Sequence, residues 1–243
     1  MHNPRFHILP LALLLTIVNM LPAQTSGYGE SPSDRPVLCY PASPAGETVQ
    51  FAVGIRLLTL PQDIVEEEIN KAPSLDLAGR LSLFPWIDVT GNATVQYFSN
   101  QLRLGLRSAH RTGDIALSAG YDVGLWFGFV DLEGFDNRAN GWTHYPHVSM
   151  GYDFGDVFLT VRSELIWMQA MRSFAGNNEV RNTRNRIAGS AWSAVLEQPF
   201  WGNTHVQLGL RLSYTDFHYQ SWFAFSTFER KLLFSELLFG VLL

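Results

Sequence analysis

The stretch DIALSAGYDVGLWFGFV, residues 114–130, constrains the fold of this chain more than any other. Every odd-numbered residue from Ile115 to Phe129 is apolar, whereas the even-numbered positions hold mainly aspartate, serine, alanine and glycine. Successive side chains of a β-strand point to opposite faces, so this alternation predicts a strand with one wholly apolar face. Such a face needs an equally long apolar environment.

The same alternation recurs along the chain, for example in residues 75–84, 101–107, 157–167 and 206–214. A period of two sustained over about ten residues predicts strands, and the helical period of 3.6 fits none of these stretches. The sequence therefore predicts an all-β chain. We expect about ten strands, at residues 47–60, 73–84, 86–98, 100–110, 114–130, 142–153, 156–169, 185–198, 203–217 and 230–243.

Tight turns near residues 85, 113, 155 and 201 alternate with longer polar segments between the expected strands. We expect long loops at residues 61–72, 132–141, 171–185 and 218–230. Aromatic residues stand near the strand ends: Trp86, Phe154, Phe200 and Trp201 on the side of the tight turns, and Tyr97, Phe129, Trp142 and Trp167 on the other side.

In these features residues 47–243 resemble the bacterial outer-membrane β-barrel proteins. The resemblance implies a closed, antiparallel, up-and-down transmembrane β-barrel of about ten strands, with eight or twelve as alternatives. A soluble β-sandwich also alternates apolar and polar residues. However, its strands are shorter, and it gives no reason for aromatic strand ends or for alternating loop lengths.

The N-terminus predicts an exported protein. Residues 1–23 have a short basic start, an apolar run at residues 8–18 and a small-residue cleavage site, as in a signal peptide. The alternative, a membrane anchor, is disfavoured because the apolar run is too short to span a bilayer. Residues 24–46 are rich in proline, glycine and serine, which predicts a flexible exported segment before the barrel at residues 47–243. We expect the protein in the outer membrane.

If the apolar faces point outward, six arginines and six carboxylates point into the barrel. Buried charges are tolerated when they are paired, so we expect a charge network that fills the lumen as a polar plug. A narrow selective path is the second interpretation. The expected network consists of Arg56, Asp76, Arg80, Asp88, Arg103, Arg107, Asp122, Arg162, Glu164, Glu197, Arg211 and Glu236.

Two short patterns resemble those of barrel enzymes. His147 and Ser149 are similar to the His-x-Ser of outer-membrane lipid A 3-O-deacylases, in which histidine activates serine toward an acyl ester. That family presents both residues to the membrane, whereas the parity of the strand predicts that here they face the lumen. We therefore expect a structural histidine, hydrogen-bonded to a carboxylate.

Asp216 and His218 are similar to the Asp-x-His pair of omptin proteases, which also need a facing aspartate pair. This chain contains no Asp-x-Asp, so we expect a solvated pair at the rim. No spacing of His, Cys, Asp or Glu suggests a metal site, and no cofactor is expected. The single cysteine, Cys39, excludes an intrachain disulfide and is expected to be a structural thiol.

The last long loop carries five aromatic residues, which we expect to enter the outer leaflet, pack over the barrel mouth or hold a ligand. They are Tyr219, Trp222, Phe223, Phe225 and Phe228. The formal net charge of −5 argues against a nucleic-acid partner. The expected partners are outer-membrane lipid, lipopolysaccharide and the barrel assembly machinery; the sequence does not set the oligomeric state.

The sequence thus predicts a non-enzymatic outer-membrane barrel that supports the envelope or passes a small or amphiphilic solute. The alternatives are a barrel enzyme that cleaves lipid or peptide, and a ligand-binding or adhesion module that works through the aromatic loop.

Overall fold

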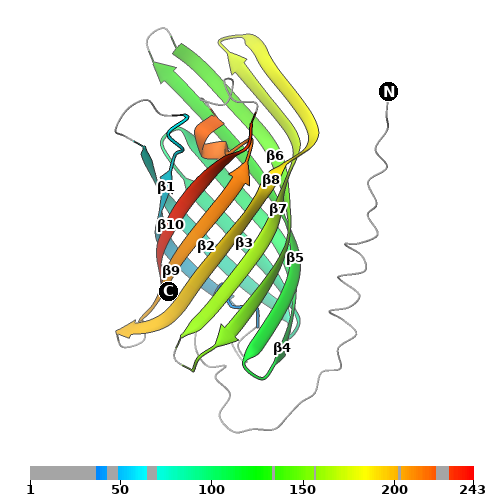
Figure 1. Ribbon diagram of the computed structural model, residues 1–243, viewed down its shortest axis with the longest axis vertical. Helices are drawn as coiled ribbons and strands as arrows, with labels where there is room; N and C mark the ends of the chain where they lie inside the picture. The colour runs from blue at the N-terminus through cyan, green and yellow to red at the C-terminus, as the bar shows by residue number, and fades with distance from the viewer. Residues whose placement is uncertain are drawn as a thin grey trace.

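The computed structural model describes residues 37–42, 49–64, 70–132, 135–155, 157–201, 204–222 and 230–243. Within them the chain forms one closed barrel of ten antiparallel strands, as predicted (Figure 1). The strands are β1 (Val49–Thr59), β2 (Lys71–Phe84), β3 (Ile87–Val95), β4 (Ser99–Thr112), β5 (Ile115–Leu132), β6 (Phe135–Asp153), β7 (Phe158–Ala175), β8 (Asn178–Trp201), β9 (Thr204–Thr215) and β10 (Leu232–Leu242).

The barrel closes where β1 pairs with β10, in a register that runs from Ala52 opposite Leu242 to Thr59 opposite Ser235. Every other strand pairs with its neighbours in the sequence, so the topology is up-and-down and the sheet has no edge strand. Only the upper extensions of β5 and β8 pass beyond the strands β4 and β9 beside them. The prediction of a closed antiparallel barrel is confirmed, and the sandwich is excluded. Among the described residues, no helix is long and apolar enough to cross a membrane.

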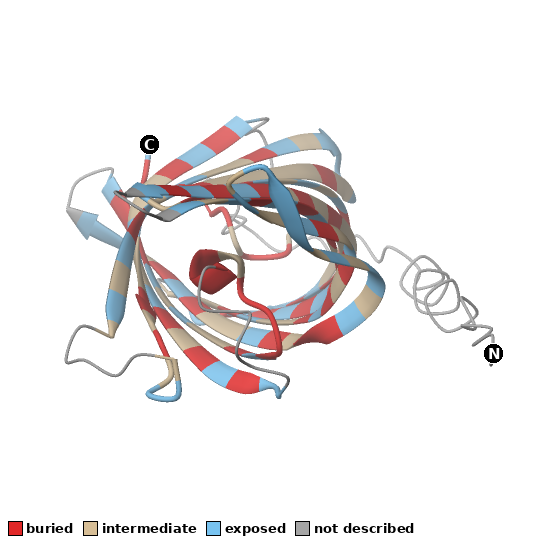
Figure 2. Ribbon diagram, turned by 90° about the horizontal axis from the view of Figure 1, so that it is seen from above, coloured by how far each residue is buried: buried red, intermediate tan, exposed pale blue. Residues whose placement is uncertain are grey.

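The outer face of the barrel is apolar. On β4, the side chains of Leu102, Leu104 and Leu106 are about half exposed. Arg103 and Arg107 on the same strand point into the barrel. The same stripes of buried and exposed residues run along most strands (Figure 2). Because a folded chain does not leave so large an apolar surface to water, the barrel wall is suited to the hydrocarbon of a membrane.

The two ends of the barrel differ. The lower end in Figure 1 carries the start of β1, the end of β10 and the tight turns between β2 and β3 and between β4 and β5. At the upper end, β5 to β8 rise above the other strands. Here the predicted loops at residues 132–141 and 171–185 are wrong, because most of these residues continue the strands.

The upper hairpins form because backbone pairing does not need an apolar face. Ser173 pairs with Arg181 and Ala175 with Asn178, around a turn in which Gly176 has a φ of +56°. Above the apolar band both faces of a hairpin meet water, so polar residues are tolerated on both sides. Polar composition alone therefore does not distinguish a loop from a solvated hairpin.

The aromatic residues expected at the strand ends are largely exposed on the outer face. Trp86, Phe154 and Phe200 are exposed near the lower end, and Tyr97, Phe129 and Trp142 toward the upper end; Trp167 is half-buried. The side chain of Trp201, the predicted signal peptide (residues 1–23) and residues 24–36 of the predicted exported segment lie outside the described part of the chain.

Replacing Leu104 with arginine should destabilise the barrel by about 2–4 kcal/mol, because the charged side chain would meet hydrocarbon. The measurement is the free energy of unfolding in denaturant of the protein refolded into lipid vesicles. The matched control is Gln62→Arg, which adds the same charge at an exposed loop position. Equal unfolding free energies for the two variants would contradict the assignment of the outer face.

Candidate functional site in the closed lumen

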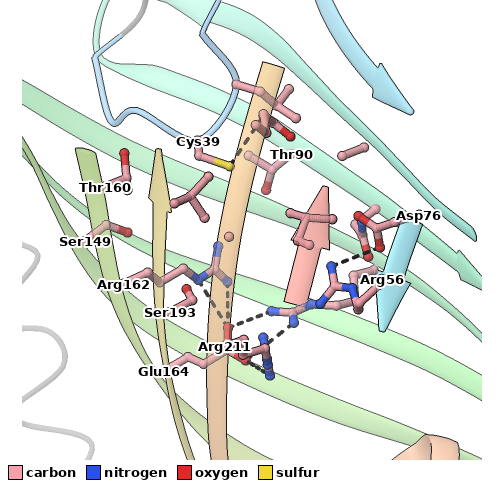
Figure 3. A pocket seen from close by; sticks show the side chains of 18 of the residues that line it. Cys39, Arg56, Asp76, Thr90, Ser149, Thr160, Arg162, Glu164, Ser193 and Arg211 are labelled. Atoms are coloured by element: carbon pink, nitrogen blue, oxygen red, sulfur yellow. Dashed lines mark hydrogen bonds and ion pairs between the residues drawn. The ribbon is translucent and has the colours of Figure 1, made fainter. Parts of the chain in front are cut away.

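The structure brings all twelve predicted lumen residues into the barrel interior. At its centre, Asp122 accepts from Arg103 at 2.8 Å and from Arg162 at 2.6 Å. Glu164 accepts from the same two arginines at 3.1 and 3.0 Å and also pairs with Arg211. Each of these carboxylates therefore has at least two cationic partners. Figure 3 shows Glu164 with Arg162 and Arg211.

A second group of ion pairs continues this cluster toward β1 and β10. Arg56 donates to Asp76 and to Glu236, both at 2.9 Å. Glu236 also pairs with Arg211 at 3.3 Å, which links the two groups. Arginine suits such a lattice because its planar guanidinium has five N–H donors and can bridge several carboxylates.

The wall makes room for these side chains at lumen-facing glycines. Gly105 on β4 stands opposite Asp122 on β5, and a Cβ at position 105 would lie 1.9 Å from the Asp122 carboxylate. Similarly, a Cβ at Gly128 would lie 2.1 Å from the indole nitrogen of Trp222. The glycines on the polar face of residues 114–130 are therefore close-approach positions, where side chains from elsewhere lie flat against the wall.

The lower end of the lumen is filled by residues 37–42, which we call the N-terminal latch. The carboxylate of Glu197 on β8 accepts backbone N–H bonds from Leu38, Cys39 and Tyr40, at 2.7 to 3.1 Å. Gln207 on β9 donates to the same carboxylate at 2.8 Å. A carboxylate that accepts this many bonds satisfies its charge without an arginine.

Two arginines hold the carbonyl groups of the latch. Arg80 donates to the carbonyls of Val37 and Tyr40 at 3.3 and 3.1 Å, and Arg107 donates to that of Cys39 at 3.1 Å. Both guanidinium groups are also paired with Asp88, at 3.0 and 2.9 Å. The latch is thus bound by its backbone, through charged groups that come from three different strands, β2, β4 and β8.

The upper part of the lumen is filled by residues 216–222, which follow β9 and turn inward (Figure 2). Phe217 and Trp222 pack against Trp126, Met168 and Met171 from the wall. The indole of Trp222 donates to the carbonyl of Phe98 at 3.1 Å. This apolar layer closes the barrel above the charged centre.

A cavity of about 180 Å³ remains between the charged centre and the N-terminal latch. Leu38 and Cys39 of the latch line it, together with hydroxyl groups of the wall and the arginines of the centre; Ser149, Thr160 and Ser193 are among its wall residues (Figure 3). It has room for several water molecules, for which the hydroxyl and guanidinium groups of its mixed polar and apolar wall offer hydrogen-bond partners.

His147 and Ser149 do face the lumen, but no hydrogen bond described for this chain joins them. His147 Nδ1 lies 3.1 Å from the carbonyl oxygen of Tyr145, and the carboxylate of Asp122 is 3.8 Å away. The groups at hydrogen-bond distance from Nδ1 are thus the Tyr145 carbonyl and the Arg162 guanidinium, also at 3.1 Å, and not the expected carboxylate. Ser149 is buried on the cavity wall.

The expectation of a solvated Asp216–His218 pair at the rim is wrong. Both side chains are buried, because the segment after β9 turns into the lumen. Asp216 pairs with Arg186, and His218 Nε2 lies 3.2 Å from Glu236. In the described part of the chain, no group of three or more His, Cys, Asp or Glu side chains is placed to hold a metal ion.

Of the aromatic loop, Trp222 is buried and Tyr219 is partly buried inside the barrel mouth, while Phe223, Phe225 and Phe228 lie outside the described residues. Sequence analysis missed the N-terminal latch. The sequence signal for the latch is a short apolar stretch within a segment otherwise rich in proline, serine and glycine. This stretch contains Val37, Leu38 and Tyr40. Such a stretch could have indicated a segment that packs against the barrel, but not that it binds in the lower end of the lumen.

No protein-family model matches this chain, and no curated protein matches it. Solved structures similar in fold are bacterial outer-membrane barrels. Neisserial surface protein A is 12% identical with a TM-score of 0.39, over 81% of this chain and 97% of that one. Outer membrane protease OmpT of Escherichia coli is 9% identical with a TM-score of 0.45, over 80% and 94%. Outer membrane phospholipase A of Escherichia coli is 10% identical with a TM-score of 0.34, over 80% and 92%. The fold of this chain, a closed barrel of ten antiparallel strands, rests on its own strand pairing.

Glu164→Leu should destabilise the barrel by about 3–5 kcal/mol, because it removes a partner from three arginines that stay buried. The measurement is again the free energy of unfolding in vesicles. Glu179→Leu makes the same chemical change at an exposed position of the upper hairpin and should have a small effect. If Glu164→Leu is as stable as this control, the charge lattice does not contribute to stability.

Glu197→Ala should release the N-terminal latch, since three backbone N–H groups and Gln207 lose their common acceptor. Cys39, the only cysteine, then reports the change. We expect a bulky maleimide to label it at least about tenfold faster, which corresponds to about 1.4 kcal/mol. The control is Gln198→Ala, the next residue of β8. An unchanged labelling rate in Glu197→Ala would mean that this carboxylate does not hold the latch.

Proposed function

We propose that this protein is a non-enzymatic barrel of the bacterial outer membrane that supports the envelope with its lumen closed. The observation that carries the proposal is that the lumen is filled at both ends, by the N-terminal latch below and by residues 216–222 above. Between them, the arginines and carboxylates are paired with one another. Nothing about this arrangement requires a bound solute.

The apolar outer face supports the membrane location. Only a closed barrel or a helix satisfies its backbone inside hydrocarbon, and this chain has a closed barrel with aromatic residues toward both ends of its apolar wall. The predicted signal peptide agrees with export to the outer membrane.

Passage of a small solute is the second candidate function. The cavity of about 180 Å³ favours it, because a site of this size lies directly behind the N-terminal latch. The lower end could then open if the latch left the lumen, while the apolar upper layer would have to move as well. Since this reading needs two displacements, we place it second.

The proposal is tested by conductance of the refolded full chain in a planar lipid bilayer. We expect no stepwise openings, because a ten-stranded barrel whose lumen is packed leaves no continuous water path. An open porin in the same bilayer is the positive control, and protease resistance shows that the barrel has inserted. Stepwise openings in the unmodified protein would overturn the closed lumen and favour passage.

The same preparation should release no acyl chain from lipid A, and Ser149→Ala should change nothing in that assay. Release that is abolished by Ser149→Ala would overturn the non-enzymatic proposal.

A further inference from the structure

Three arginines project outward from the raised wall formed by β6, β7 and β8. Arg138 pairs across the strands with Phe174, Arg172 with Asn140, and Arg184 with Ala170. Paired residues of neighbouring strands share one face of a sheet. Because Asn140 also pairs with the exposed Phe127, and Ala170 with the exposed Trp142, this shared face is the outer one. We call Arg138, Arg172 and Arg184 the outer arginine face.

Most arginines of the barrel wall are paired with a carboxylate, and the arginines on the inner face of this hairpin have polar partners. Arg186 and Arg181 stand on the same hairpin but on its inner face; Arg186 pairs with Asp216, and Arg181 donates to Thr183. By contrast, no carboxylate of the described residues lies within 4.0 Å of any member of the outer arginine face. The guanidinium carbon of Arg138 lies 5.1 Å from the centroid of the Phe174 ring.

The spacing of the three arginines concentrates their charge. Arg172 is the diagonal neighbour of both Arg138 and Arg184, and such neighbours have Cα atoms about 7–8 Å apart. Long side chains at this distance can converge on one anion or on two neighbouring ones. The acidic residues of the same face, Asp131, Asp136 and Glu179, stand toward the tips of the hairpins, and none of them lies within 4.0 Å of the three arginines.

The height of the outer arginine face points to the membrane surface. Ten residues separate the exposed Tyr152 from the exposed Trp142 on β6. At about 3.4 Å per residue and a strand tilt of about 40°, they span about 26 Å, close to the apolar band of about 25 Å in such barrels. Pairing links Arg184 to Trp142 through Ala170, and a tilt of this size changes the height by about 3 Å for each strand crossed. All three arginines therefore stand within about 10 Å of the level of Trp142, where the lipid head groups lie.

We propose that the outer arginine face binds the phosphate groups of a phosphorylated glycolipid in the outer leaflet, of the lipopolysaccharide type. Arginine binds phosphate through paired N–H donors, and the aromatic residues directly below can contact the acyl chains. Asn140 and Asn182, on the same face, add further hydrogen-bonding groups. The inference rests on the proposed outer-membrane location, but not on whether the lumen conducts.

The test is binding of bisphosphorylated lipid A to the refolded barrel in a neutral detergent, measured as lipid retained in native mass spectrometry. The triple variant Arg138→Gln, Arg172→Gln, Arg184→Gln should bind it at least about tenfold more weakly than the unmodified protein. The matched control removes three positive charges from the upper end outside this face, as Arg181→Gln, Arg230→Gln, Lys231→Gln. It should bind within about twofold of the unmodified protein.

Two further probes identify the ligand chemistry. Lipid A with its phosphates removed should bind at least about tenfold more weakly to the unmodified barrel, and inorganic phosphate at millimolar concentration should not displace bisphosphorylated lipid A. Equal binding by the triple variant, equal binding of dephosphorylated lipid A, or displacement by free phosphate would each overturn the inference. Conductance of the same preparations reports separately on the closed lumen, so the two proposals can fail independently.

Discussion

Every backbone N–H and C=O group within hydrocarbon needs a partner from the chain itself, and this constraint determines the whole architecture. A sheet meets it only by closing, which here occurs between β1 and β10. Closure makes an outer face that must be apolar and an inner face that never meets lipid. The strict alternation of residues 114–130 places apolar side chains on the outer face and mainly polar or small ones on the inner face.

The inner face then poses a second problem, because a narrow lumen of polar groups is poorly supplied with water. The chain solves it with a lattice in which carboxylates such as Asp122 and Glu164 are shared between arginines. It places this lattice between two non-barrel segments of different chemistry. The lower segment is bound through its backbone by charged side chains, whereas the upper one is bound by apolar packing. The two closures can therefore respond to different conditions.

The strands, the facing of their residues and the identity of the buried charges could be predicted from the sequence, because they follow from a period of two. The pairing of those charges could not be, since it depends on strand register. Polar composition also misled at residues 132–141 and 171–185, where backbone pairing continues in water. The inward turn of residues 216–222 and the docking of the N-terminal latch in the lumen depend on contacts over long sequence separations. No local sequence pattern encodes such contacts.

The N-terminal latch also has a consequence for the order in which the chain folds. The backbone amides that Glu197 accepts lie 157 to 159 residues before it in the chain. Closing so long a loop in an unfolded chain costs about 3 kcal/mol more entropy than closing a short hairpin, at about 0.6 kcal/mol for each doubling of length. Once β1 has joined β10 and β8 is in place, Tyr40 is separated from its site only by the short connection to Val49. The folded barrel wall thus lowers the entropic cost of binding the N-terminal latch. Contacts of this kind form late in folding. We therefore expect the N-terminal segment to enter a lumen that already exists.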